Sequence, residues 1–218
     1  MNKPILNVNT LKEEAKKFSK YESSHDEPTL FGVTDGKAVG TYLEHKFQKY
    51  LHEQYIYEEG SSAKGIDFPE LLVDIKVTSI KQPQSSCPFK SAKQKIYGLG
   101  YSLLIFVYEK SDNERKHTGR LNILHTIFVD SHRTSDFQTT SRLLDIINND
   151  GNSDDIKAFF EERLLPIEEI QAEELASEIL LHPPQIGYLT ISNALQWRLQ
   201  YSRVIQKAGE IEGIYRVI

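Results

Sequence analysis

Two aspartates and a lysine within residues 65–78 have the types and the spacing for metal-assisted chemistry. From Leu71 onwards apolar and polar residues alternate, which predicts a strand with one apolar face, because strand side chains repeat every second residue. Asp74 and Lys76 then share the polar face. Asp67 precedes them and is separated from them by a proline-containing segment that predicts a turn. A hairpin with acidic residues on both arms is therefore expected.

The distance between the two aspartates depends on the turn. If the turn is a two-residue loop at Glu70-Leu71, Asp67 lies directly across from Asp74, with Cβ atoms roughly 5 Å apart. Two carboxylates at that distance repel each other unless a cation lies between them, and a small gap between hard oxygen ligands suits Mg²⁺. A register slip of one residue moves Asp67 to the other face. The alternative is an ordinary hairpin with a surface ion pair between Asp74 and Lys76.

An acid, a turn and then Asp-x-Lys resembles the signature of the PD-(D/E)xK nuclease superfamily, in particular of type II restriction endonucleases. The resemblance matches Asp67 to the first acid, Asp74 to the second and Lys76 to the lysine. One departure is that the proline follows Asp67 by two positions instead of preceding it. The resemblance implies Mg²⁺-dependent hydrolysis of double-stranded DNA at a short specific sequence. It also implies a homodimer with two-fold symmetry and a companion DNA methyltransferase in the same system.

A helix is predicted over about 37–54, because its apolar residues recur at helical spacing. In the resembled family a helix before the acidic hairpin often carries a glutamate directed at the metal. Glu44, at the edge of the apolar face, is the matching position, and the alternative is a solvated helix glutamate. The resemblance thus implies Asp67, Asp74 and Glu44 as Mg²⁺ ligands, with Lys76 completing the catalytic residues.

The chain has 218 residues, which suits one domain with a buried core. Its longest apolar run, residues 103–108, is far too short to span a bilayer, and the N-terminus has no apolar signal core. The one cysteine, Cys87, excludes an internal disulfide and fits a reducing cytoplasm, where we expect the protein to work. No HxH or HxxxH pair and no GxxxxGKS/T or GxGxxG stretch occurs. A histidine metal cluster and a nucleotide-hydrolysing motor are therefore not expected.

Charge is distributed unevenly along the chain, although the net charge is only −5. Residues 76–120 carry nine basic and three acidic side chains, a net charge of plus six. Residues 145–178 carry two basic and eleven acidic side chains, a net charge of minus nine. A polyanion is therefore expected to bind one side only. The alternative is that these are simply solvated helix faces.

Candidate DNA contacts lie in the basic stretch, at the start of the 37–54 helix and near the C-terminus. The segment after the hairpin is rich in amides and hydroxyls; Gln pairs with adenine, and Ser and Lys readily contact phosphates. The alternative is an ordinary polar loop. A helix is also predicted over 190–208. It either contacts DNA, forms a dimer interface or simply packs against the core as a terminal helix. The DNA-contacting set expected is Lys37, Lys81, Gln82, Gln84, Ser85, Ser86, Lys90, Lys93, Arg198 and Arg203.

The order of predicted elements indicates an α/β fold with a small mixed β-sheet flanked by helices, as in the restriction-endonuclease-like core. Helices are expected over 8–20, 37–54 and 91–99, strands over 55–57, 71–78, 101–108 and 121–129, and a charged hairpin loop over 109–120. We assign this core to residues 1–135. Residues 136–218 form a mostly helical extension for DNA recognition or dimerisation, packed on the same domain. Helices are expected there over 136–149, 153–164, 167–181 and 190–208, with a closing strand over 211–218.

Two other functions remain open at this point. The first is a structure-specific or repair nuclease of the same fold, such as a junction resolvase; the long helical extension argues against it. The second belongs to another class, a catalytically inactive DNA-binding module. Against that module stand three intact signature positions, Asp67, Asp74 and Lys76, because an inactive copy has no need to keep all three.

Overall fold

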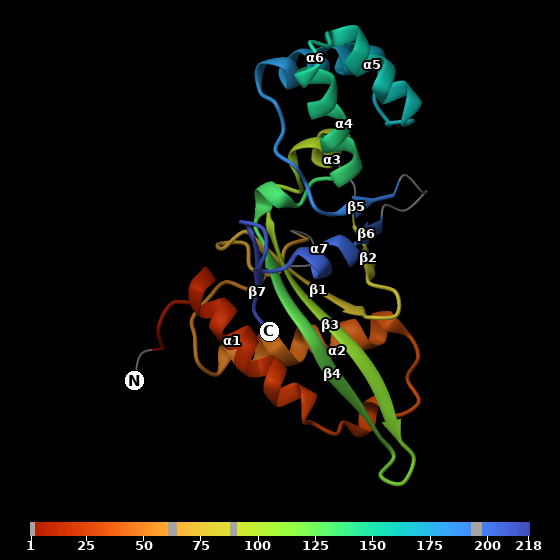
Figure 1. The fold of residues 1–218 in the computed structure, drawn as a ribbon. Helices are drawn as coiled ribbons and strands as arrows, with labels where there is room; N and C mark the ends of the chain where they lie inside the picture. Colours follow the sequence, from red (N-terminus) through yellow and green to blue (C-terminus); the bar gives the residue numbers. More distant parts are fainter. Residues whose placement is uncertain (1–2, 61–64, 88–90, 193–197) are drawn as a thin grey trace.

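The computed structural model describes residues 3–60, 65–87, 91–192 and 198–218. Its centre is a four-stranded mixed sheet in the order β1-β3-β4-β7 (Figure 1). β1 runs parallel to β3, and β4 is antiparallel to both β3 and β7. The strands are β1 (Val73–Ser79), β3 (Ser102–Asn113), β4 (Thr118–Val129) and β7 (Ile214–Arg216). The predicted α/β class with a small mixed sheet flanked by helices is confirmed.

Two N-terminal helices cover one face of this sheet. They are α1 (Val8–Ser23) and α2 (Gly36–His52), joined through the short 3₁₀ helix η1 (Pro28–Leu30). Phe18 of α1, Phe47 of α2 and Phe106 of β3 meet with ring centroids 4.9 to 6.0 Å apart. Their burial gives α2 a fixed position along the edge strand β1, since apolar surface removed from water is the main stabilising term.

The opposite face is covered by a second, smaller sheet in the order β2-β6-β5. Its strands are β2 (Gln84–Ser86), β5 (Thr190–Ile191) and β6 (Arg198–Gln200), and α7 (Ser202–Lys207) follows β6. Leu199 and Tyr201 are fully buried against this face of the central sheet. The predicted helix over 190–208 is confirmed at residues 202–207, which form α7, and wrong at 190–191 and 198–200, which pair as strands. Residues 198–200 alternate exposed, buried, exposed, as expected of a strand. Residues 193–197 of that prediction lie outside the described residues.

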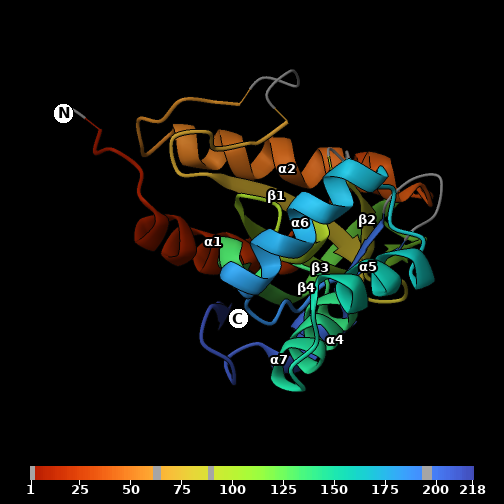
Figure 2. The ribbon, with the colours of Figure 1, turned by 90° about the horizontal axis from the view of Figure 1, so that it is seen from above.

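Four helices gather at one end of the central sheet (Figures 1 and 2). They are α3 (Lys93–Tyr97), α4 (Phe137–Asn148), α5 (Ser153–Glu162) and α6 (Glu169–Leu181). We call α4–α6 the helical lobe. It has its own core around Ile96, Leu143 and Phe160. The three helices predicted between 136 and 181 are confirmed, and the predicted closing strand is present as β7, which returns the chain to the central sheet.

Three predicted elements differ from the structure. The charged segment 109–120 is not a loop, because β3 continues to Asn113 and β4 begins at Thr118, so the two strands form a long hairpin. Residues 55–57 contribute only an isolated bridge between Ile56 and Ile5 instead of a strand. The expected strand at Leu71 begins two residues later, at Val73. Across the described ranges, every helix is too short or too polar to cross a membrane.

Candidate active site

Asp67 and Asp74 are placed opposite each other by the hairpin that leads into β1. Phe68 and Val73 exchange both backbone hydrogen bonds, at 2.9 and 3.2 Å. The next pair along the two arms is therefore Asp67 with Asp74, as the sequence predicted. The loop itself spans four residues, 69–72, instead of the predicted two, and Leu72 adopts a φ of 51°. The longer loop keeps the same centre, so the register is unchanged.

The Asp67 carboxylate is held at the open edge of β1. Its Oδ2 accepts a hydrogen bond from the backbone N–H of Ile75 at 2.7 Å. Its Oδ1 accepts one from the side-chain amide of Gln48 on α2 at 3.3 Å. These two bonds tie the hairpin to the strand and to the helix at the same time. The orientation of Asp67 is thus fixed by the fold.

Asp74 is buried, with only 4% of its surface exposed, beside both Asp67 and Lys76. Burial raises the pKa of the Asp74 carboxyl to about 7; Lys76 opposes this rise and the Asp67 carboxyl adds to it. The Lys76 Nζ lies 2.5 Å from the Asp74 Oδ2, yet that oxygen accepts no well-directed hydrogen bond within the described part of the chain. This carboxylate thus lies beside a cation, and Lys76 supplies it.

Glu44 and Lys76 belong to the same electrostatic environment. Burial raises the pKa of the Glu44 carboxyl, with Lys76 lowering it and Asp74 raising it further. Burial alone would lower the pKa of the Lys76 amine, but Asp74, Asp67 and Glu44 together raise it. Lys76 is therefore a cation at neutral pH, surrounded by three carboxyl groups from α2, the hairpin and β1.

The donor set fits a hard divalent cation. Among the described residues no group of three or more His, Cys, Asp or Glu side chains is close enough together to form a closed metal site. Mg²⁺ does not need one, because it keeps several waters and is usually bound by one or two carboxylates and substrate phosphates. The opposed Asp67 and Asp74 carboxylates provide such a pair.

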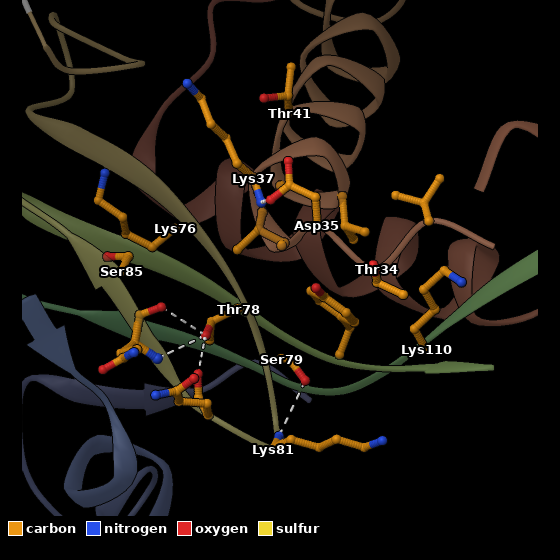
Figure 3. A pocket seen from close by; sticks show the side chains of 18 of the residues that line it. Thr34, Asp35, Lys37, Thr41, Lys76, Thr78, Ser79, Lys81, Ser85 and Lys110 are labelled. Atoms are coloured by element: carbon orange, nitrogen blue, oxygen red, sulfur yellow. Dashed lines mark hydrogen bonds between the residues drawn. The ribbon is translucent and has the colours of Figure 1, made fainter. Parts of the chain in front are cut away.

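A groove of about 990 Å³ opens beside these residues (Figure 3). Its walls come from the start of α2, from β1 and β3, and from β2 with β6. Glu44 and Lys76 line it, together with the predicted DNA contacts Lys37, Lys81, Gln82, Gln84, Ser85, Ser86 and Arg198. Asp67 instead lines a neighbouring hollow of about 570 Å³ that also includes Glu44 and Gln48. Glu44 thus lines both hollows, whereas the buried Asp74 lines neither.

Two predicted DNA contacts are not brought to the groove, and a third falls on a residue that is not described. Lys93 on α3 forms an ion pair with Glu178 of the helical lobe at 2.5 Å. The guanidinium carbon of Arg203 lies 3.6 Å from the centre of the Phe137 ring, so this side chain packs within the fold. Lys90 lies outside the described residues. The prediction for Arg203 assumed one continuous helix over 190–208. In the structure a strand, β6, precedes the short helix α7, so the Arg203 side chain points in a different direction from that expected.

Sequence reasoning did not single out several groove and site residues. Lys110, on the extended part of β3, lines the groove, as do Thr34 and Asp35 before α2. Gln48 holds Asp67. A signal for Gln48 was present, because it lies one helical turn after Glu44 and therefore on the same face of α2. For Lys110 the signal was hidden by assigning 109–120 to a loop.

Comparison with known proteins agrees with this geometry. A family model described as "Type II restriction enzyme NspV" matches residues 5–216. A relative from Nostoc sp. (strain ATCC 29411 / PCC 7524), named "Type II restriction enzyme NspV", is 62% identical over 213 residues, which cover 98% of this chain and 97% of the relative. No solved structure matches the chain.

The class of protein follows from these matches. The chain is a type II restriction enzyme, a site-specific endodeoxyribonuclease. More narrowly, it belongs to the NspV family of type II restriction enzymes, because both the family model and the relative cover almost its whole length.

Proposed function

We propose that this chain hydrolyses phosphodiester bonds of double-stranded DNA at a short specific sequence, with Mg²⁺ held by Asp67, Asp74 and Glu44. The supporting observation is the opposed Asp67–Asp74 pair beside Lys76, which itself lines a groove that contains most of the predicted DNA contacts. This arrangement is that expected of a PD-(D/E)xK nuclease. Family membership supports the restriction activity, and the residue roles are inferred from the geometry.

Each residue has a distinct part in the proposed reaction. Bound Mg²⁺ supplies a water of lowered pKa and neutralises charge on the phosphate oxygens. Lys76, a cation held by Asp74, is placed to donate hydrogen bonds to the attacking water and to a nonbridging phosphate oxygen. Gln48 and the Ile75 N–H keep the Asp67 carboxylate in one orientation. The chemistry therefore depends mainly on positioning and on electrostatic stabilisation.

The partners follow from the reaction. One chain provides one active site, so cutting both strands at a palindromic site is best served by a homodimer with two-fold symmetry. A companion DNA methyltransferase is needed in the same system, because unmodified host sites would otherwise be cut. The protein is expected to act in the cytoplasm, where its DNA substrate is found.

The test is plasmid cleavage by two variants. Asp74→Ala and Lys76→Ala are each expected to lower cleavage of supercoiled plasmid in Mg²⁺ by at least about 10²-fold, as for removal of a key transition-state contact. Binding to the same DNA in Ca²⁺ should change little. The matched control is Lys207→Ala, whose side chain pairs with Glu210 on α7, away from the groove. Wild-type rates for either test variant would refute the assignment.

The digest also separates the other candidate functions. Discrete bands from plasmid and phage DNA indicate a restriction enzyme, whereas cutting of branched DNA alone indicates a resolvase. Absence of cutting with any divalent metal indicates an inactive binding module. Run-off sequencing of the cut ends then gives the recognition sequence and the stagger.

A further inference from the structure

Strands β2 and β6 are neighbours in the three-stranded sheet β2-β6-β5, and we call this pair of strands the ribbon. Gln84, Ser85, Ser86 and Arg198 of the ribbon line one wall of the groove, whereas Gln200 is not among the lining residues. The two strands pair antiparallel, with Gln84 opposite Gln200, Ser85 opposite Leu199 and Ser86 opposite Arg198. Side chains of directly opposed residues lie on the same face of a sheet. The pair Gln84–Gln200 and the pair Ser86–Arg198 therefore share one face, and Ser85–Leu199 occupies the other.

Burial identifies which face is turned outward. Leu199 is fully buried, and the Ser85 hydroxyl lies 2.5 Å from the hydroxyl of the fully buried Tyr201, so this row points into the protein. Arg198, Gln200 and Ser86 are exposed, and Gln84 is half-buried. We call Gln84, Ser86, Arg198 and Gln200 the outward row. Within the described residues no side-chain hydrogen bond or ion pair occupies this row, so its amides, hydroxyl and guanidinium are available to a ligand.

The ribbon is held at a fixed distance from the active site. The Thr78 hydroxyl, two residues after Lys76 on β1, accepts a hydrogen bond from the Gln84 N–H at 2.9 Å and lies 3.1 Å from the Gln84 carbonyl oxygen (Figure 3). The N–H of Tyr201 donates to the Pro83 carbonyl at 2.8 Å. A single strand, β1, therefore carries Asp74 and Lys76 and also anchors the start of β2.

We propose that the outward row is the base-reading surface of this enzyme, with Gln200 as a specificity residue beside Gln84 and Arg198. The inference rests on the proposed function. In the major groove of B-DNA, Gln amides pair with adenine and Arg pairs with guanine, and the outward row presents both side-chain types. Ser85 does not read bases, because its hydroxyl is turned to Tyr201. The lysines of the facing walls, Lys37 and Lys110, contact phosphates instead.

Base reading and phosphate contact predict different results in a sequence-selection experiment. Wild type, Gln200→Ala and Arg198→Ala would each be used to select bound duplexes from a random-sequence library in Ca²⁺, and to cut the same library in Mg²⁺. Loss of one bidentate base contact lowers discrimination roughly 5- to 150-fold at one base pair. Gln200→Ala is expected to relax an A·T position and Arg198→Ala a G·C position, with the other positions unchanged.

Matched controls come from exposed residues outside the groove. Gln206→Ala on α7 and Arg142→Ala on α4 remove the same side-chain types from exposed positions and should retain the wild-type profile. Circular-dichroism melting of each variant shows that it is folded. An unchanged profile for Gln200→Ala, or an equal loss of binding on all sequences, would overturn the proposal, and so would the absence of any selected sequence with wild type. Sequence selection without cutting in Mg²⁺ would contradict the proposed nuclease function while leaving the base-reading surface supported.

Discussion

At the scale of single residues, the two aspartates stand in an unfavourable environment in the absence of a cation. Asp74 is buried beside Asp67, and even with Lys76 2.5 Å away the ionised form of its carboxyl is disfavoured, as the raised pKa shows. Two carboxylates this close repel each other, and burial of Asp74 adds a desolvation cost, so the like-charged pair does not by itself stabilise the fold. The pair is therefore best explained by what it binds.

Removal of this charge is expected to stabilise the metal-free protein. Asp74→Asn keeps the shape of the side chain and removes the ionised carboxylate. At about pH 8 and without metal we therefore expect a higher melting temperature, by about 2–4 °C for each kcal/mol gained in the free energy of unfolding. Because a pKa raised in the folded state makes stability fall as pH rises between the unfolded value of 3.8 and about 7, the gain should shrink as pH falls below about 7 and be nearly lost near 3.8. Mg²⁺ should stabilise wild type and not the variant. A lower melting temperature for metal-free Asp74→Asn at about pH 8 would contradict this account.

Gln48 is a positioning residue, since its amide orients the Asp67 carboxylate without reaching the groove. Groups that hold a metal ligand in place typically contribute 10- to 100-fold to metal affinity or activity. Gln48→Leu is therefore expected to raise the Mg²⁺ concentration for half-maximal cutting by about 10-fold, with most of the rate restored at saturating Mg²⁺. Gln54→Ala, at an exposed position two residues beyond the end of α2, is the control. A lower rate at all Mg²⁺ concentrations, with an unchanged midpoint, would indicate a role other than positioning.

At the scale of elements, Glu27 joins four parts of the fold. Its carboxylate accepts hydrogen bonds from the Thr29 N–H and hydroxyl and from the Tyr42 hydroxyl, and it lies 3.2 Å from His25. Its backbone pairs with Gly119 at the start of β4. Burial alone would raise the pKa of Glu27, but these hydrogen bonds lower it to about 2. The connection between η1, α2 and the β3–β4 hairpin therefore depends on an ionised Glu27.

This connection makes stability depend on pH in the acid range. A depressed folded-state pKa adds stability above the unfolded value of 4.5, and the added stability is lost as pH falls towards about 2. Glu27→Gln is expected to be less stable than wild type at about pH 7, by on the order of 1–3 kcal/mol. The difference should decline as pH falls below about 4.5. Glu53→Gln, exposed beyond the end of α2, is the control in urea unfolding. A constant difference across this range would show that the shape of the side chain matters and not its charge.

The sequence predicted well those elements in which local pattern and tertiary packing agree. The alternation from Val73 to Ser79 marked β1, and the spacing of Val39, Leu43 and Phe47 marked the buried face of α2. The register that opposes Asp67 and Asp74 followed from the centre of the turn, even though the loop is longer than expected. These features could be derived because each depends on residues close together in the chain.

Elements formed by distant partners could not be derived in the same way. Residues 198–200 become a strand because β2, more than a hundred residues earlier, supplies the backbone partners and Tyr201 is buried beneath it. Helical propensity in that region was overridden by this pairing. The groove has the same origin, since its walls come from α2, β1–β3 and β6, and sequence alone gives no distance between them. The charge pattern of the sequence indicated a basic surface within residues 76–120, but it did not show which of these residues line the groove.

At the scale of the whole molecule, charge separates the groove from the helical lobe. The groove is lined by five basic side chains (Lys37, Lys76, Lys81, Lys110 and Arg198) and three acidic ones (Asp35, Glu44 and Asp112), a net charge of plus two. Residues 145–178, which include α5 and most of α6, carry a net charge of minus nine. In Figure 1 the lobe lies beyond one end of the central sheet and the β3–β4 hairpin projects from the other. A polyanion bound in the groove is therefore attracted by one part of the protein and repelled by another, which favours a single orientation.

The salt dependence of DNA binding tests this separation. Each phosphate neutralised by a lysine adds about 0.9 to the slope of log K against log salt concentration. Lys37→Ala should weaken binding on all sequences and lower that slope by about 1, whereas Glu162→Gln, at the exposed end of α5 in the lobe, should leave the slope unchanged. Binding would be measured in Ca²⁺ over a range of potassium chloride concentrations. Equal slopes for Lys37→Ala and wild type would remove the α2 wall from the DNA interface. A steeper slope for Glu162→Gln would show that the lobe, despite its charge, approaches the phosphates.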